Sequence, residues 1–261
     1  MEVILIVGVA VVLIYLYYTL QEYLKNPLKS FPTPSVEPVE KVPEIYTLPD
    51  PLDILKSSEQ GVVVRLIAQF GRKVNANALS DALLEIFLKD LSQMGTETKN
   101  LEDLKKLYAS EDMPSLESLC TQFLELAHGE YKKRVKLVEF LLVLAYSDGI
   151  LGEAEREALI DVGAFLRLEN ADFNQLYEGF EQLSLQSTEL SPQEALEILG
   201  TGENPKLSFE DKVNQNHLNI LDPKTWNKSY IPDRMQTLWQ LQQAYNTLQN
   251  TPAKVSLAKN N

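Results

Sequence analysis

Residues 137–168 constrain the fold of this chain most, because their pattern predicts two helices joined by one tight acidic turn. The first half is apolar on almost every face, so we expect that helix to lie among other helices. Ser147-Asp148-Gly149 would end it, since glycine adopts the left-handed backbone that closes a helix without a steric penalty. In the second half, apolar residues recur at three- and four-residue spacing, which predicts a second helix with one buried stripe. The sequence thus predicts a central helical hairpin.

Helical periodicity continues on both sides of this hairpin, and no segment from Asp53 onward alternates convincingly as a strand does. The predicted helices span residues 60–70, 79–93, 101–108, 116–128, 132–147, 153–166 and 171–185. We expect them to pack as one all-α bundle over residues 55–187, with the apolar helix inside.

A separate apolar run at residues 3–20 has the length of a helix that crosses a bilayer core, about 18–20 residues. A cleaved signal peptide is the alternative, but neither a basic segment before the run nor a small-residue cleavage site after it is present. Lysines follow the run and none precedes it, which places the bulk of the chain in the cytoplasm. We expect residues 1–22 to be a single transmembrane anchor with its N-terminus outside. Gly8 and Ala10 would let two such helices approach, so a homodimer is a further possibility.

Residues 23–54 are rich in proline and predict a linker between this anchor and the bundle. More than half of the chain's 13 prolines fall there. Such a segment is extended and semi-rigid, rising about 3.1 Å per residue where it is polyproline-like. We expect a stalk, with a proline-motif ligand for a small recognition domain as the alternative.

Composition excludes several functions. A formal net charge of -13 argues against a partner that is duplex nucleic acid, because phosphate contact needs clustered Lys and Arg. Cys120 is the only cysteine, so an intramolecular disulfide and a thiolate zinc cluster are excluded. His128 and His217 have no plausible catalytic partner nearby in sequence, and no phosphate-binding loop or serine elbow is present. We therefore expect a protein that is not an enzyme and has no cofactor.

The acidic turn allows two interpretations. Asp148, Glu153 and Glu155 are carboxylates at a turn and in the next helical turn, and they could converge on a divalent cation such as Ca²⁺ or Mg²⁺. Alternatively, Asp148 caps backbone amides while the two glutamates offset the helix dipole. The pattern lacks the regular alternation of oxygen ligands that an EF-hand loop has.

The residues from Leu144, Leu-Ala-Tyr-Ser-Asp-Gly-Ile-Leu-Gly-Glu-Ala-Glu, resemble the repeat of TerB-like domains. That repeat has an alanine, then Asp-Gly, an aliphatic residue, and Glu seven residues after the Asp; Asp148, Gly149, Leu151 and Glu155 match it. The resemblance covers roughly residues 60–180 and implies an all-helical domain that is suspected of binding divalent metal. Residues 66–74 repeat the helix, glycine turn and aliphatic residue without the acid, so we expect any chemistry in the second copy alone.

The C-terminal part predicts a small domain of three helices over residues 188–250, followed by a flexible tail at 251–261. Ser191-Pro192-Gln193-Glu194 is a strong helix start, with a capping serine, proline at the first helical position and a capping-box glutamate, and Gly200 would end this helix. A second helix is expected from Ser208 to residue 219 or 220, and a third over residues 232–249.

These three helices resemble a J-domain. Ala195-Leu-Glu-Ile-Leu-Gly is similar to the first helix of that family, and Gln242-Gln-Ala-Tyr-Asn-Thr-Leu to the last. A working J-domain carries His-Pro-Asp after a basic second helix, and that tripeptide stimulates the ATPase of a DnaK-type chaperone. Here Leu221-Asp222-Pro223-Lys224 stands at that place, and the second helix offers only Lys212 as a basic residue. The resemblance therefore implies Lys212, Asp222, Pro223 and Lys224 as partner-binding residues in a degenerate J-like domain.

The order of anchor, TerB-like bundle and J-like domain resembles the DjlA family of membrane-anchored proteins. This resemblance implies a co-chaperone-like adaptor in the bacterial inner membrane, whose cytoplasmic domains recruit or regulate a DnaK-type chaperone, another J-domain protein or a membrane complex. Without the histidine, we expect binding without ATPase stimulation. The alternative is a structural accessory subunit of a larger membrane assembly that uses both domains as scaffold.

Overall fold

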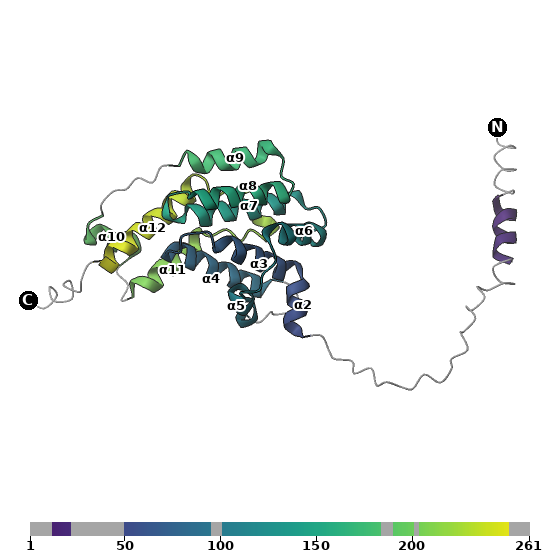
Figure 1. Cartoon of the computed structure of the whole chain (residues 1–261), viewed down its shortest axis with the longest axis horizontal. Helices are drawn as coiled ribbons and strands as arrows, with labels where there is room; N and C mark the ends of the chain where they lie inside the picture. The colour runs from purple at the N-terminus through teal and green to yellow at the C-terminus, as the bar shows by residue number, and fades with distance from the viewer. Residues whose placement is uncertain (1–11, 22–49, 95–100, 184–189, 201–203, 251–261) are drawn as a thin grey trace, which may run out of the picture. The chain divides into compact units, whose positions relative to one another are not determined.

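The computed structural model describes residues 12–21, 50–94, 101–183, 190–200 and 204–250 (Figure 1). All regular secondary structure in these ranges is helical, which confirms the predicted all-α class. The chain divides into two compact units, residues 1–48 and residues 49–261, and each is described by itself.

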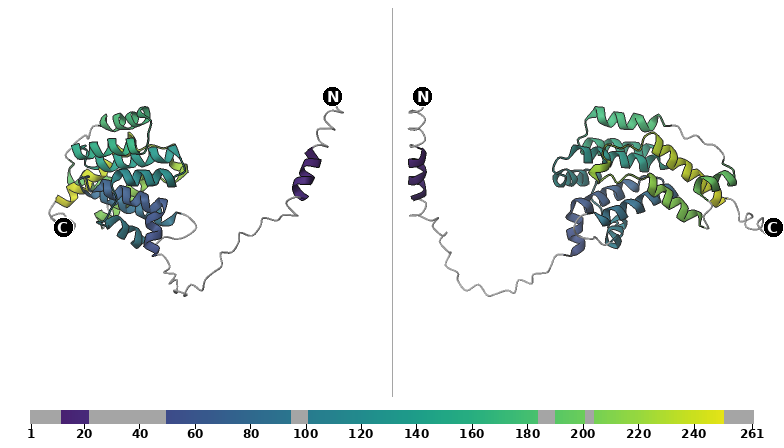
Figure 2. Two further views of the ribbon diagram at one scale, coloured as in Figure 1. Left: turned by 45° about the vertical axis from the view of Figure 1, so that its right-hand side comes forward. Right: turned by 180° about the vertical axis from the view of Figure 1, so that it is seen from behind.

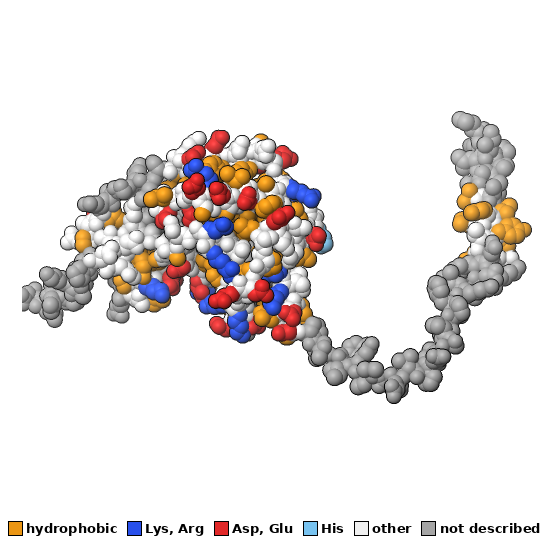
Figure 3. All heavy atoms as spheres, viewed as in Figure 1, with side chains coloured by type: hydrophobic (Ala, Val, Ile, Leu, Met, Phe, Trp, Pro, Cys, Tyr) orange, Lys and Arg blue, Asp and Glu red, His pale blue; other side chains and the backbone are white. Residues whose placement is uncertain are grey.

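In the first unit, residues 12–21 are helical and residues 12–20 are exposed. Hydrophobic side chains lie on the face of this short helix that Figure 3 shows. Most of the rest of the predicted anchor, residues 1–11, lies outside the described residues, as do residues 22–49 of the predicted linker and the tail at 251–261. Within the described ranges, no helix has both the length and the apolar character needed to cross a membrane.

The second unit begins with a helix whose first residues were predicted to belong to the linker. Helix α2 spans Pro51–Ser57. The Asp50 side chain accepts the backbone N–H of Leu52 at 2.9 Å, and Pro51 occupies the first helical position. Proline fits there because its missing N–H would have no partner inside the helix. Pro51 therefore starts a helix instead of extending the stalk.

The bundle helices agree closely with their predicted ranges. They are α3 (Glu59–Gly71), α4 (Ala78–Gln93), α5 (Leu101–Ala109), α6 (Leu116–Leu126), α7 (Tyr131–Ala145), α8 (Glu153–Phe165) and α9 (Asn170–Glu181), with the 3-10 turn η1 (Tyr146–Asp148) between α7 and α8. Every residue from 136 to 145 on α7 is buried, so the predicted central helix is confirmed. Figures 1 and 2 show α7 and α8 between α9 on one side and α3 and α4 on the other.

The C-terminal helices belong to the same compact unit as the bundle. They are α10 (Pro192–Leu199), α11 (Pro205–Asn216) and α12 (Asp233–Asn250), with the 3-10 turn η2 (Pro223–Thr225) between the last two. Helices α11 and α12 pack against α4, and Trp239 of α12 donates its indole N–H to the Tyr146 carbonyl at 2.6 Å. The predicted boundary between residues 187 and 188 thus lies inside one unit.

Helix α11 corrects the predicted second helix at both ends. It starts before Ser208, because the Asn204 side chain accepts the N–H groups of Lys206 and Leu207 and Pro205 takes the first helical position. It ends at Asn216 instead of residue 219 or 220. The connection from His217 to Pro232 is consequently a long loop, and we call residues 217–232 the α11–α12 loop.

Candidate functional site

The acidic turn folds as the capping interpretation predicts. Gly149 follows η1 with a φ of 84°, the left-handed conformation expected for it. Oδ1 of Asp148 accepts the backbone N–H of Ile150 at 3.0 Å. Gly152 takes the N-cap position of α8, and Oε2 of Glu155 accepts its N–H at 2.6 Å. The carboxylates at this turn therefore satisfy backbone groups that a helix end leaves without partners.

Glu155 also joins the two copies of the internal repeat. Its Oε1 accepts the backbone N–H of Asn75, in the loop between α3 and α4, at 3.2 Å. From the same loop, the Asn75 side chain donates to Asp148 at 3.4 Å and the Asn77 side chain donates to Ser147 at 2.7 Å. The loop that follows the first glycine turn is thus in direct contact with the second turn, and Glu155, 2% exposed, lies at this contact.

These contacts favour the capping interpretation over the predicted metal site. Both oxygens of Glu155 accept backbone N–H groups, and burial raises the pKa of its carboxyl above the usual value, which opposes a second role as an anionic ligand. Glu153 is exposed on the first turn of α8. Among the described residues, no group of three His, Cys, Asp or Glu side chains could hold a metal ion. Asp148, Glu153 and Glu155 are thus not arranged as such a group in this structure.

The predicted partner-binding residues lie on two elements. Lys212 is half-buried on α11, whereas Asp222, Pro223 and Lys224 make the η2 turn of the α11–α12 loop. Oδ1 of Asp222 accepts the backbone N–H of Lys224 at 3.0 Å, so this carboxylate caps the turn. Pro223 and Lys224 are exposed.

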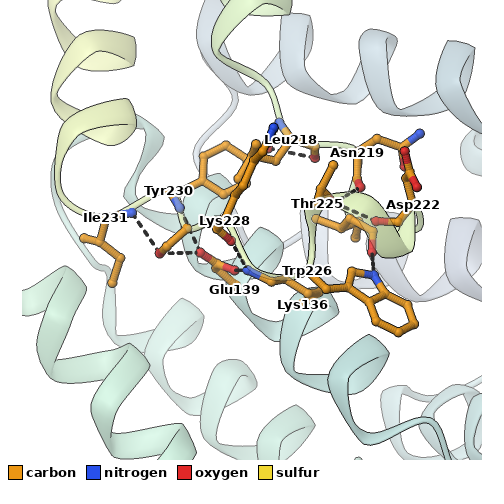
Figure 4. A network of polar contacts seen from close by, with 12 residues as sticks. Lys136, Glu139, Leu218, Asn219, Asp222, Thr225, Trp226, Lys228, Tyr230 and Ile231 are labelled. Atoms are coloured by element: carbon orange, nitrogen blue, oxygen red, sulfur yellow. Dashed lines mark hydrogen bonds and ion pairs between the residues drawn. The ribbon is translucent and has the colours of Figure 1, made fainter.

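Glu139 of α7, which is not among the predicted site residues, attaches the α11–α12 loop to the centre of the bundle (Figure 4). Oε1 of this carboxylate accepts the Ser229 hydroxyl at 2.8 Å and the Tyr230 backbone N–H at 2.9 Å. Its Oε2 lies 2.6 Å from Nζ of Lys136, which also donates to the Lys228 carbonyl. Glu139 is 1% exposed, so the pair is buried under the loop.

A second buried group holds the start of the same loop. The Tyr230 hydroxyl accepts the Leu218 N–H at 2.9 Å and lies 3.0 Å from Nδ1 of His217. Nε2 of His217 lies 3.2 Å from Oδ2 of Asp90 on α4. Burial raises the pKa of the Tyr230 phenol, so this hydroxyl stays neutral. His217 had no partner nearby in sequence because Asp90 is 127 residues away.

One local signal could have found the Glu139 site. Lys136 and Glu139 are the charged residues of an otherwise apolar stretch that was predicted to be buried, and they stand three residues apart on one helix face. A buried charge needs a partner. The identity of the loop atoms that complete the site depends on long-range folding.

Beside this network lies a groove of about 700 Å³ between α7, α9 and residues 226–231 of the loop. We call it the α7–α9 groove. Its lining includes Lys132, Lys136, Asp172, Leu176, Trp226 and Lys228. It therefore combines cationic groups with an apolar wall.

One of three comparisons with known proteins finds a match, and the matched residues include the acidic turn. Searches among curated proteins and among solved structures find no match. The resemblance of residues 188–250 to a J-domain, and that of the whole chain to the DjlA family, stay predictions. Residues 75–178, from the loop before α4 into α9, match the family model of the tellurite resistance protein TerB, so this part of the chain is similar to a TerB domain, as its Asp-Gly turn predicted.

Proposed function

We propose that this chain is a non-enzymatic helical adaptor that recruits or regulates other proteins from a membrane surface. The TerB-like region, compatible with an adaptor or scaffold, supports the first half of this proposal. Its partner would be a DnaK-type chaperone, another J-domain protein or a membrane complex. Binding would occur without stimulation of a chaperone ATPase.

The observation that carries this proposal is the attachment of the α11–α12 loop to Glu139. In a working J-domain the corresponding loop presents His-Pro-Asp to the chaperone. Here the loop lacks the histidine, and its later part is tied to α7 through Ser229, Tyr230 and the carbonyl of Lys228. A loop that is held by internal contacts suits a module that binds a partner better than one that stimulates a chaperone ATPase.

The membrane location rests on the N-terminal apolar segment. Residues 12–18 and 20 expose large apolar or aromatic side chains, with exposed fractions between 56% and 68%. Exposing this surface to water would cost a free energy of about 25 cal/mol per Å² of apolar area. A bilayer would cover it, with the N-terminus outside and the folded unit in the cytoplasm.

One observation favours a second candidate, a structural accessory subunit of a larger membrane assembly. The C-terminal helices share one compact unit with the bundle, and Trp239 anchors α12 on the η1 turn. Such integration fits a rigid scaffold that holds neighbouring subunits.

An ATPase assay of a DnaK-type chaperone with the purified full chain tests the proposal. We expect no stimulation by the natural chain, and stimulation would contradict it. The combined substitutions Asp222→His and Lys224→Asp place His-Pro-Asp at the η2 turn and show whether the loop geometry still permits chaperone contact. Affinity purification of the full chain then separates the candidates, because a stoichiometric membrane complex would favour the accessory subunit.

A further inference from the structure

We propose that the α7–α9 groove binds an acidic peptide segment of a partner protein, with aliphatic side chains between its carboxylates. This inference rests on the proposed adaptor function and names the chemistry of the partner. The groove lies next to the Glu139 network and is separate from the acidic turn.

The apolar wall of the groove is held in a defined position. Trp226 is half-buried, and its indole N–H donates to the Ile220 carbonyl at 2.9 Å, which fixes the ring. Leu176 of α9 and Ile231 of the loop, both half-buried, also line the groove. Because a fixed aromatic ring offers contact area at little entropic cost, it suits an aliphatic side chain of a bound segment.

The charges of the groove favour an anionic partner. Its lining includes Lys132, Lys136 and Lys228 against the carboxylates of Glu139 and Asp172, in a chain whose net charge is -13. Glu139 pairs with Lys136, whereas Asp172 has no cationic partner among the described residues and accepts the Tyr131 hydroxyl at 2.5 Å, so the lining carries one more cation than anions. Across the described ranges, Lys132 and Lys228 form no ion pair, and both are exposed. Two cations therefore remain available on the rim.

The size of the groove fits a short peptide stretch. Its volume, about 700 Å³, lies within the roughly 300–1,000 Å³ of ordinary ligand pockets. The backbone of the loop at this edge is fixed by Glu139, so the groove is preformed and binding would not have to order it. Carboxylates spaced along an extended segment would reach the two rim lysines while aliphatic groups meet Trp226.

The probe is a fluorescent peptide in which glutamates alternate with leucines, added to the purified full chain and followed by anisotropy. A second peptide, with glutamines in place of the glutamates, measures how much the apolar side chains contribute to the affinity without the carboxylates. The test variant combines Lys132→Glu and Lys228→Glu. The control variant combines Lys73→Glu and Arg156→Glu, which changes two exposed cations outside the groove by the same charge. Unchanged melting temperatures would show that both variants fold.

We expect the acidic peptide to bind with an affinity that falls as salt is added, because rim charges are screened. The test variant should bind about tenfold more weakly, and the control variant within about twofold of the natural chain. Absence of binding, or equal loss in both variants, would overturn the inference. So would selective binding of phosphatidylserine vesicles without peptide binding, which would identify the groove as a membrane contact.

Crosslinking in cells separates this inference from the proposed function. A photoreactive residue at Gln175, in the groove, is compared with one at Ile160, an exposed position on α8 outside the groove. A protein that is crosslinked only through position 160 would support the adaptor function and contradict the proposal that the groove binds the partner. A lack of crosslinks at both positions would count against both proposals.

Discussion

Glu139 on α7 accepts the backbone N–H of Tyr230 at 2.9 Å across 91 residues of sequence. The same carboxylate also accepts the Ser229 hydroxyl and pairs with Lys136. A buried side chain of the central helix thus binds the α11–α12 loop. The central helix of the bundle therefore positions the loop between the last two helices.

Glu139→Ala should lower the free energy of unfolding by about 3–5 kcal/mol, because it strands the buried Lys136 ammonium and leaves the Tyr230 N–H without its acceptor. Urea denaturation followed by circular dichroism measures the change. Adding Lys136→Met should recover part of the loss, since the unpaired charge is then removed. Glu157→Ala, at an exposed position on α8, is the control and should change stability by less than about 0.5 kcal/mol. A similar effect of both alanine variants would contradict a structural role for Glu139.

Gly61→Ala should destabilise the junction between α2 and α3. A Cβ at Gly61 would lie 1.8 Å from the Leu55 carbonyl oxygen, so backbone has to move. We expect the free energy of unfolding to fall by about 3 kcal/mol, because the backbone cannot move far enough to relieve the overpacking. The matched control is Gly71→Ala near the end of the same helix, whose Cβ would lie 3.0 Å from the hydroxyl of Tyr108, at the tip of a side chain that can shift. Equal melting temperatures for both variants would show that α2 does not pack at this distance.

The stability contributed by Glu155 should fall as pH rises. Burial raises the pKa of its carboxyl above the ordinary value of 4.5, so between that value and the raised pKa the folded state binds more protons than the unfolded state. The contribution is complete below 4.5 and is lost as pH increases through the folded pKa.

Glu155→Gln removes this titration and isolates it from all other groups. The stability of the natural chain minus that of Glu155→Gln should decrease as pH rises from 4.5, in urea titrations at matched pH values. A difference that grows with pH would mean that the two backbone donors, Gly152 and Asn75, outweigh burial.

Cys120 should report global unfolding. Its side chain is fully buried, and burial raises the pKa of the thiol to about 12. The thiolate is the reactive form, so labelling by a disulfide reagent at pH 8 should be slow in the folded protein and should accelerate with urea in step with the unfolded fraction. Rapid labelling without denaturant would show that this part of the core opens locally.

The sequence by itself determined the helices of the second unit, apart from α2 and the bounds of α11, because the signals that form a helix are local. Apolar spacing located the central helix, Gly149 marked the end of the α7–η1 segment, and Ser191 with Glu194 gave a capping box that the structure contains. Asp50 and Pro51 carried a helix start of the same kind, which the surrounding prolines obscured.

Only the tertiary structure decided which turns and loops meet. The local pattern left the Glu155 carboxylate as either a metal ligand or a backbone cap, and in the structure the N–H of Asn75, 80 residues away, donates to one of its oxygens. Likewise, the local pattern predicted three C-terminal helices, but their attachment to the bundle depends on Trp239 reaching Tyr146 and on Glu139 reaching Tyr230. Hydrogen bonds of this kind have no sequence period, because they join residues that the folding of the whole chain brings together.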